Sequence, residues 1–209
     1  MKLIGITQQL LEIKRYHEVR SNLDIRWYSL LNSLNLLPLP LPLDIGISSY
    51  DNFNISGLII TGGGDLYSQS KDELSLRRDN YEKECIKYAI KNSIPVIGIC
   101  RGMQLIAEYF DSTLKKVENH VGVRHGFKTK KNSRFSHIFD KINNVNSFHE
   151  SSIDVIGSEL EVVGFSPNDN IVEAISHKKH SIIGQMWHPE RENPFDENQS
   201  KVISSFFDA

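Results

Sequence analysis

Three short apolar runs divide the first half of the chain, and each ends in a polar or glycine-rich turn. They read KLIGIT at 2–7, GLIIT at 57–61 and PVIGIC at 95–100. Each run is almost continuously apolar and rich in β-branched residues, which is typical of strands buried on both faces of a sheet. We therefore predict three buried strands.

Longer segments with a helical spacing of apolar residues separate these runs. They cover about 20–35 and about 73–92, and a further helix is expected at about 102–110, directly after the third strand. This alternation of strands and helices predicts parallel pairing with right-handed crossovers. The segment LPLPLPL at 37–43 has proline at every second position, so we expect it at a sheet edge or in an extended loop.

After Phe110 the pattern changes to shorter, alternating pieces that indicate antiparallel strands. These pieces lie at 160–165, 171–175 and 181–186, and a closing helix is expected at 198–207. The chain shows no internal repeat and no linker. The expected fold class is α/β, with a doubly wound, mostly parallel, flavodoxin-like central sheet, an antiparallel section in the C-terminal half, and one domain over 1–209.

Composition and charge narrow the function classes. The 209 residues carry a formal net charge of -2, which gives no reason to expect nucleic acid as a partner. No apolar run reaches the roughly 18 residues of a membrane span, and the start lacks a secretory signal pattern. The two cysteines are too few for a disulfide framework or for a zinc site of their own. We therefore expect a soluble, cytoplasmic protein without membrane or nucleic-acid partners.

One of these cysteines, Cys100, stands at the end of the third predicted strand, between Gly98 and Gly102. The G-x-C-x-G spacing matches a nucleophile elbow, in which a tight strand-to-helix turn exposes the nucleophile. The following helix N-terminus and the cation of Arg101 both favour a thiolate. The spacing alone leaves open a second interpretation, a buried structural cysteine. Cys85, at helical spacing with two tyrosines, is expected in the core.

A candidate base follows the last strand-like run. His188 emerges there at a strand end, and Glu190 is placed to accept the second imidazole proton. Pro189 stiffens the connection between the two. Taken alone, His188 is better explained as an ordinary core or surface histidine. Together with Cys100 and Glu190, it indicates a Cys-His-Glu triad.

The segment TGGGD at 61–65 is a candidate oxyanion hole. Glycines let the backbone approach a ligand closely, and we expect the N–H groups of Gly63 and Arg101 to stabilise the negative charge of an acyl-transfer intermediate. A phosphate cradle is the alternative, but neither of the common glycine-rich phosphate-binding patterns is present.

With these motifs in place, the sequence resembles the class I glutamine amidotransferase superfamily. The resemblance rests on TGGGD, GICRGMQ and WHPE, in this order along the chain. The arginine of GICRG, RRDNYE at 77–82 and VNSFHE at 145–150 are similar to its stand-alone γ-glutamyl hydrolase branch, the C26 peptidase-like group. This resemblance implies a small-molecule γ-glutamyl amide substrate, a γ-glutamyl thioester on Cys100 that water cleaves, and no cofactor or metal.

The resemblance also implies which residues hold the glutamyl group. They are Gln104, Ser147 and Phe148, with Asn146 as a neighbour. Gly62 and Gly64 of the glycine turn are further expected substrate-binding residues.

The leaving amine is expected to meet the basic segment at 120–131. We hypothesise that His120, Arg124 and His125 bind an anionic leaving group, because arginine and histidine suit phosphate or carboxylate recognition. The resemblance implies, as one such group, a nucleotide phosphoramidate of capsular polysaccharide synthesis. The lysines of this segment, Lys128, Lys130 and Lys131, are expected to form a solvated basic face. Arg26 and Trp27 are further candidates for this side, although an aromatic residue at helical spacing is more often part of the core.

Three functions compete at this stage. The first is a stand-alone γ-glutamyl amide hydrolase, and the second is a glutaminase subunit that delivers ammonia to a separate synthetase partner. The third, a non-catalytic binding protein, is disfavoured because the set of Cys100, His188 and Glu190 is complete. The sequence does not predict an oligomeric state.

Overall fold

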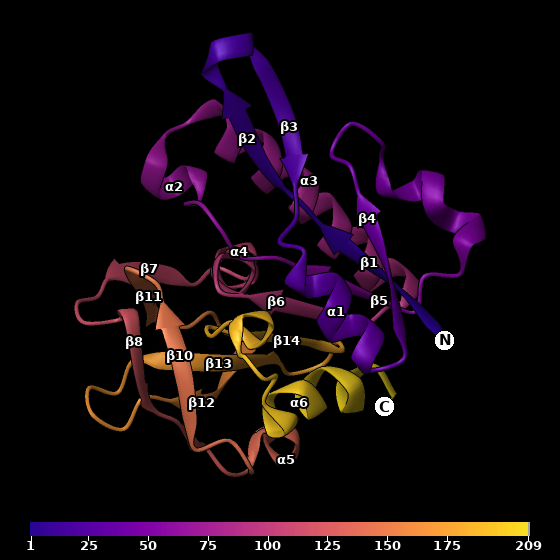
Figure 1. The fold of residues 1–209 in the computed structure, drawn as a ribbon. Coiled ribbons are helices and arrows are strands. Elements are labelled where there is room, and N and C mark those ends of the chain that lie inside the picture. The colour runs from indigo at the N-terminus through magenta and orange to yellow at the C-terminus, as the bar shows by residue number, and fades with distance from the viewer. Residues whose placement is uncertain (209) are drawn as a thin grey trace.

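The structure, a computed structural model, describes residues 1–208. Its centre is an eight-stranded sheet in the order β4-β1-β5-β6-β14-β13-β12-β9 (Figure 1). The parallel strands are β4 (Leu36–Leu41), β1 (Lys2–Thr7), β5 (Gly57–Ile60), β6 (Val96–Ile99) and β14 (Ile182–Gln185). The antiparallel section continues through β13 (Val172–His177), β12 (Leu160–Phe165) and β9 (Lys128–Thr129). The predicted fold class is confirmed.

Helices cover both faces of the sheet. Because β1 connects to β4 on one side and β5 connects to β6 on the other, right-handed crossovers place the connecting helices on opposite faces. Accordingly, α1 lies over one face with α6, and α3 packs beside α4 over the other (Figure 1). The helices are α1 (Arg26–Ser33), α2 (Tyr67–Ser70), α3 (Glu73–Asn92), α4 (Arg101–Tyr109), α5 (Ser136–Phe139) and α6 (Glu197–Asp208). Among the described residues, none of these helices has both the length and the apolarity that a membrane crossing requires.

The predicted strands at 2–7, 57–61 and 95–100 and the proline-rich edge strand at 37–43 are all present. The predicted helix at about 20–35 is wrong in its first part. Residues up to Asn22 form a hairpin of β2 (Gln9–Ile13) and β3 (Glu18–Asn22), and α1 begins only at Arg26. The hairpin projects beyond the sheet and pairs only with itself, so most of its side chains are exposed and leave no burial pattern in the sequence (Figure 1).

Two further ribbons lie in the C-terminal half and were not predicted. They pair β7 (Thr113–Lys116) with β11 (Ser151–Val155), and β8 (Val121–Gly126) with β10 (Asn144–Phe148). Both are two-stranded, and several of their residues are exposed, which again weakens the apolar alternation.

Small residues let α4 lie directly on the sheet. A Cβ on Gly184 of β14 would come within 2.7 Å of Met103, and one on Gly98 of β6 within 2.5 Å of Ile106. This close packing fixes the N-terminus of α4 over the carboxyl ends of β5, β6 and β14, where a doubly wound sheet offers its ligand crevice. Cys85, in contrast, lies on the buried face of α3, as the sequence predicts, and burial raises the pKa of its thiol.

Candidate active site

Cys100 occupies the sharp turn between β6 and α4. Its backbone has φ 51° and ψ -107°, a conformation that residues with a side chain rarely adopt. Its N–H donates to the Gln185 carbonyl at 2.8 Å, and its carbonyl accepts from the Gln104 N–H at 3.1 Å. These bonds hold a strained turn, the feature that the G-x-C-x-G spacing predicts.

Glycine is required on both sides of this turn. A Cβ on Gly98 would come within 2.6 Å of the Gly102 backbone, and a Cβ on Gly102 would lie 2.1 Å from the carbonyl oxygen of Ile60. Real Cβ atoms do not approach backbone atoms this closely, so any larger residue would push α4 off β5 and move the sulfur.

His188 is held from two directions. Its backbone N–H donates to Asn146 Oδ1 at 2.9 Å, and Asn146 Nδ2 donates back to the His188 carbonyl at 2.8 Å. Its ring Nδ1 lies 2.6 Å from Glu190 Oε1, so the carboxylate accepts the Nδ1 proton and leaves Nε2 for the substrate side. Glu190 sits in the short 3-10 turn Pro189–Arg191 and is buried.

The charges around His188 favour its protonated form. Burial acts to lower the pKa of His188, but the Cys100 thiolate and the Glu190 carboxylate outweigh burial and raise the pKa to about 9. Gly62 lies against both groups, because a Cβ there would be 2.6 Å from His188 Cε1 and 3.3 Å from Cys100 Cβ. Sulfur, imidazole and carboxylate are thus brought together, as the sequence predicts, in an arrangement suited to a thiolate–imidazolium pair.

The glycine turn after β5 is oriented by Arg78 of α3. The Arg78 guanidinium donates to the carbonyls of Thr61 at 2.7 Å, Gly62 at 3.2 Å and Gly63 at 2.7 Å. In a trans peptide the N–H points opposite to the carbonyl, so the N–H groups of Gly63 and Gly64 point away from Arg78. They are therefore free of this network, as the predicted oxyanion hole requires.

The side chain of Arg101 does not face the sulfur as a free cation. It is buried and pairs with Asp79 and with Glu82, the latter at 2.6 Å, and it also donates to the Asp65 carbonyl at 3.3 Å. The expectation that its charge favours the thiolate is therefore revised, because two carboxylates balance that charge. Its backbone N–H is one of the first amides of α4, which have no partner within the helix.

A cavity of about 250 Å³ opens on one side of Cys100. Gln104 and Phe148 line it together with Gly64, and their contact with the glutamyl group stays a prediction. Gln104 Nε2 donates to the Ser151 carbonyl at 2.9 Å, so its amide is fixed in orientation.

Asn146 and Ser147 lie behind this wall rather than in it. Asn146 clamps the His188 backbone, and the Ser147 hydroxyl donates to the His120 carbonyl at 2.7 Å. Neither is among the lining residues of the cavity, so the structure gives both a positioning role and shows no direct route to substrate.

A second cavity of about 200 Å³ opens on the other side of the turn. His188 and Glu190 line it, and so do Trp27 and Arg191. Its outer wall is the β2–β3 hairpin, through Gln9 and Asn22, which the sequence analysis did not single out. Only their position in a polar hairpin next to the first strand could have suggested them.

The basic segment at 120–131 reaches the cavity beside Cys100 through Val121, but its histidines and its arginine do not line that cavity. His120 and His125 are buried around Glu173, and Arg124 forms an ion pair with Glu192 at 2.8 Å. None of the three lines either cavity beside Cys100 in the described chain, so their contact with a leaving group stays a prediction. The lysines of the segment are exposed, as expected.

Comparison with known proteins places the chain in a defined group. The profile of the Peptidase C26 family matches residues 2–190. The chain is 39% identical to the gamma-glutamyl-CDP-amidate hydrolase of Campylobacter jejuni, with 98% of this chain and 96% of that protein covered. It is 26% identical to a glutamine-hydrolyzing GMP synthase subunit of Methanococcus aeolicus, with 75% and 74% covered. In fold it is similar to a glutamine amidotransferase from Thermotoga maritima, with a TM-score of 0.68 at 16% identity over 99% of this chain and 83% of that one.

The substitution Glu190→Gln tests the charge balance at His188. The pKa of His188 is raised from 6.5 to about 9, so its contribution to stability is complete below pH 6.5 and is lost as the pH rises through about 9. Removing the carboxylate lowers this pKa. As the pH rises over that range, we therefore expect the free energy of unfolding of the variant to fall by about 1–2 kcal/mol less than that of the wild type. Urea unfolding from pH 6.5 to pH 9.5 measures this, with the exposed Glu84→Gln as control; parallel curves for wild type and Glu190→Gln would contradict the assignment.

The substitution Arg78→Lys tests the orientation of the glycine turn. Lysine keeps the charge beside Glu82 but cannot bond three carbonyls, so we expect kcat to fall by about tenfold or more while KM changes little. Alkylation of Cys100 by iodoacetamide develops no oxyanion and should keep its rate. The neighbouring, exposed Arg77→Lys is the matched control, and equal loss of alkylation and turnover in Arg78→Lys would show general damage instead.

Proposed function

The chain belongs to the Peptidase C26 family, and on this basis we propose that it hydrolyses γ-glutamyl amides through a γ-glutamyl thioester on Cys100. The observation that carries the proposal is the joint placement of a strained nucleophile turn, a buried His188–Glu190 pair and a glycine turn whose N–H groups are free.

In the first half of the reaction, the Cys100 thiolate attacks the γ-carbonyl carbon of the substrate. Negative charge builds on the carbonyl oxygen, and the N–H groups of Gly63 and Arg101 stabilise it. The His188 imidazolium then gives its Nε2 proton to the amide nitrogen as the C–N bond breaks. The amine departs, and the glutamyl group remains on sulfur.

In the second half, His188 is neutral and accepts a proton from water as the water oxygen attacks the thioester carbon. The C–S bond breaks, Cys100 leaves as a thiolate, and glutamate is released. Glu190 keeps the imidazole in the required tautomer throughout and stabilises its charged form. The resting thiolate–imidazolium pair is thereby restored.

The two cavities suit the two halves of the substrate. We assign the glutamyl group to the cavity of Gln104 and Phe148, in which polar groups converge beside the sulfur. The leaving amine belongs on the other side, because His188 must reach its nitrogen and lines only the cavity of Trp27 and Arg191. This assignment separates recognition of the acyl group from recognition of the amine.

An anionic nucleotide phosphoramidate is the leaving group that we propose. The support is the name of the Campylobacter jejuni relative, a gamma-glutamyl-CDP-amidate hydrolase that matches nearly the whole chain. Within the second cavity Arg191 offers a cation whose Nε lies 3.8 Å from Glu190 Oε1, whereas Arg124 is paired more closely, with Glu192 at 2.8 Å. A role in capsular polysaccharide modification, and a place in the cytoplasm, where Cys100 stays reduced, complete this proposal.

The competing function is a glutaminase subunit that passes ammonia to a synthetase partner. Its support is the more distant similarity to a glutamine-hydrolyzing subunit of a GMP synthase. Such a subunit would act on free glutamine and would depend on its partner, whereas the proposed hydrolase acts alone on amides with large leaving groups.

A panel of γ-glutamyl amides tests the nucleophile and the choice between these functions. We expect glutamate release from γ-glutamyl-CDP-amidate to exceed release from glutamine, and Cys100→Ala to lower turnover of every substrate by about 10⁴-fold or more. Cys85→Ala, the other cysteine of the chain, is the control. Glutamine as the best substrate would favour the glutaminase, and substantial turnover by Cys100→Ala would remove the thioester mechanism altogether.

Two arginine variants test the leaving-group side. We expect Arg191→Ala to raise KM for γ-glutamyl-CDP-amidate by about 10-fold or more, because an ionic contact to the anionic half is lost. Its effect on an uncharged γ-glutamyl anilide should be small. Arg124→Ala separates this assignment from the sequence-based hypothesis. If Arg124→Ala selectively raises KM for the anionic substrate and Arg191→Ala does not, the leaving group lies by the basic segment.

A further inference from the structure

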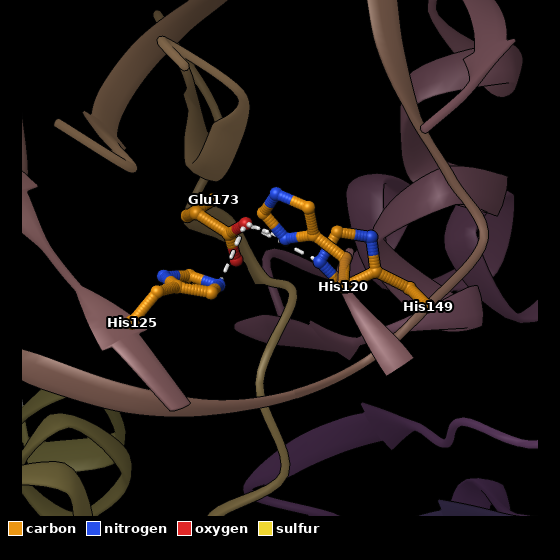
Figure 2. A group of neighbouring side chains, drawn as sticks. All are labelled: His120, His125, His149 and Glu173. Atoms are coloured by element: carbon orange, nitrogen blue, oxygen red, sulfur yellow. Dashed lines mark hydrogen bonds and ion pairs between the residues drawn. The ribbon is translucent and has the colours of Figure 1, made fainter. Parts of the chain in front are cut away.

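We propose that His120, His125, His149 and Glu173 bind one divalent transition-metal ion, with Zn²⁺ as the preferred ion, at a structural site that shares His149 with the lining of the cavity beside Cys100 but includes no residue of the triad. The four side chains converge in the C-terminal half of the fold (Figure 2). His120 precedes β8, His125 lies within it, His149 follows β10, and Glu173 lies on β13.

The first argument is geometric. One carboxylate oxygen, Glu173 Oε1, lies 3.4 Å from His120 Nδ1, 3.4 Å from His125 Nε2 and 3.2 Å from His149 Nε2. Ligand atoms at the corners of a tetrahedral zinc site, about 2.0–2.1 Å from the ion, are about 3.3 Å apart. All four donor atoms lie within 4.8 Å of one another, so only small side-chain shifts would place them at tetrahedral positions around one ion.

The second argument is the direction of the ring protons. The outer nitrogen of each imidazole faces an acceptor: His120 Nε2 faces Asp169 Oδ2 at 2.8 Å, His125 Nδ1 the Gly126 carbonyl at 2.9 Å, and His149 Nδ1 the Ser151 carbonyl at 3.1 Å. Those contacts require a proton on each outer nitrogen. In neutral rings each inner nitrogen then carries a lone pair, and all three face Glu173 Oε1. His120 Nδ1 also lies 3.2 Å from Ser147 Oγ, but the one proton of that hydroxyl is donated to the His120 carbonyl.

Four acceptors that face one another repel unless a positive charge lies between them. One proton on an inner nitrogen would satisfy only that histidine, and satisfying all three in this way would crowd three imidazolium ions around one buried carboxylate. A single divalent cation satisfies all four acceptors at once. The outer contacts then have the form found around metal-bound histidines, whose second N–H is held by a carboxylate or a backbone carbonyl.

The third argument is the presence of orphaned polar atoms. His125 Nε2 and Glu173 Oε2 are buried and have no hydrogen-bond partner among the described residues. Glu173 is fully buried, and the three histidines are at most 9% exposed. Unsatisfied atoms of this kind are rare in a native interior and require an explanation, which a coordinated ion provides.

The arrangement favours a structural ion over a catalytic one. Four protein ligands close a tetrahedral shell and leave no open position for a water molecule or a substrate. Three imidazoles and one carboxylate also suit zinc better than the hard cations Ca²⁺ and Mg²⁺. The ion would tie β8 and the end of β10 to β13, and so hold Phe148, the neighbour of His149, against the glutamyl cavity.

This inference departs from the sequence analysis, which expects no metal. His120 and His125 have the H-x4-H spacing that is common among zinc ligands, but the sequence analysis assigns this pair to a leaving group. His149 and Glu173 lie 24 and 48 residues beyond His125, so the sequence alone does not bring the four ligands together.

Metal analysis of the full chain tests the site directly. The measurements use protein without an affinity tag and with the substitution Cys100→Ala, so that the active-site thiol cannot bind the metal. After stripping, exposure to Zn²⁺ and dialysis, we expect about one ion per chain by mass spectrometry. We also expect Tm to rise by about 5–10 °C over the stripped protein. Co²⁺ should give the strong visible absorption of a tetrahedral site without a sulfur ligand.

The variant His125→Leu removes one ligand, and His137→Asn, at an exposed histidine outside the cluster, is its control. We expect His125→Leu to lose the stoichiometric ion and the rise in Tm, and His137→Asn to keep both. The proposal is overturned if the Cys100→Ala protein retains no ion from Zn²⁺, Co²⁺ or Mn²⁺, or if His125→Leu binds as much as the control. None of these measurements depends on turnover, so they test the metal site independently of the proposed hydrolase function.

Discussion

A buried network of four charges behind the glycine turn is the constraint on which the active site depends. Arg78 and Arg101 provide two positive charges, and Asp79 and Glu82 provide two negative ones, so the network is neutral. Glu82 accepts from Arg78 at 2.9 Å, from Arg101 at 2.6 Å and from the Thr7 hydroxyl at 2.7 Å. Removing charges from water is costly, and only such complete pairing offsets the cost.

This network connects every element that meets at the nucleophile. Thr7 ends β1, Arg78 and its acidic partners lie on α3, and Arg101 begins α4 directly after Cys100. Their bonds leave the glycine turn and the start of α4 little freedom to move. Stabilisation of a developing oxyanion depends on donors that are already in place, so an ionic network without contact to substrate still contributes to the reaction rate. Arg101, the residue after the nucleophile, therefore stabilises this turn through its buried ion pairs and does not act as a free cation.

Local motifs made much of the site predictable, and non-local contacts account for the rest. Cys100, His188 and Glu190 follow strand ends or lie two residues apart, so the spacing of apolar runs was enough to bring them together. The role of Arg78 could not be predicted, because the carbonyls that it bonds lie 15–17 residues away along the chain. The β2–β3 hairpin was missed for a different reason. Its exposed side chains contribute little to the core, so its sequence does not show the alternation of apolar and polar residues that indicates a strand.

The two sides of the nucleophile are built with different rigidity, and this bears on how substrate choice can be encoded. The glutamyl cavity is walled by α4, which packs on the central sheet and carries Arg101 of the ionic network, and by the end of β10, which the two Asn146–His188 bonds hold to the active-site turn. The amine cavity is walled by a hairpin that pairs only with itself and by the first turn of α1. Because substitutions in exposed hairpin residues cost the core little, the amine side can be altered while the sulfur, the imidazole and the oxyanion donors stay in place. If the leaving amine binds in this cavity, as proposed, a single acyl-transfer apparatus can in this way accept different amines, and its specificity depends on the hairpin and Arg191 rather than on the sheet.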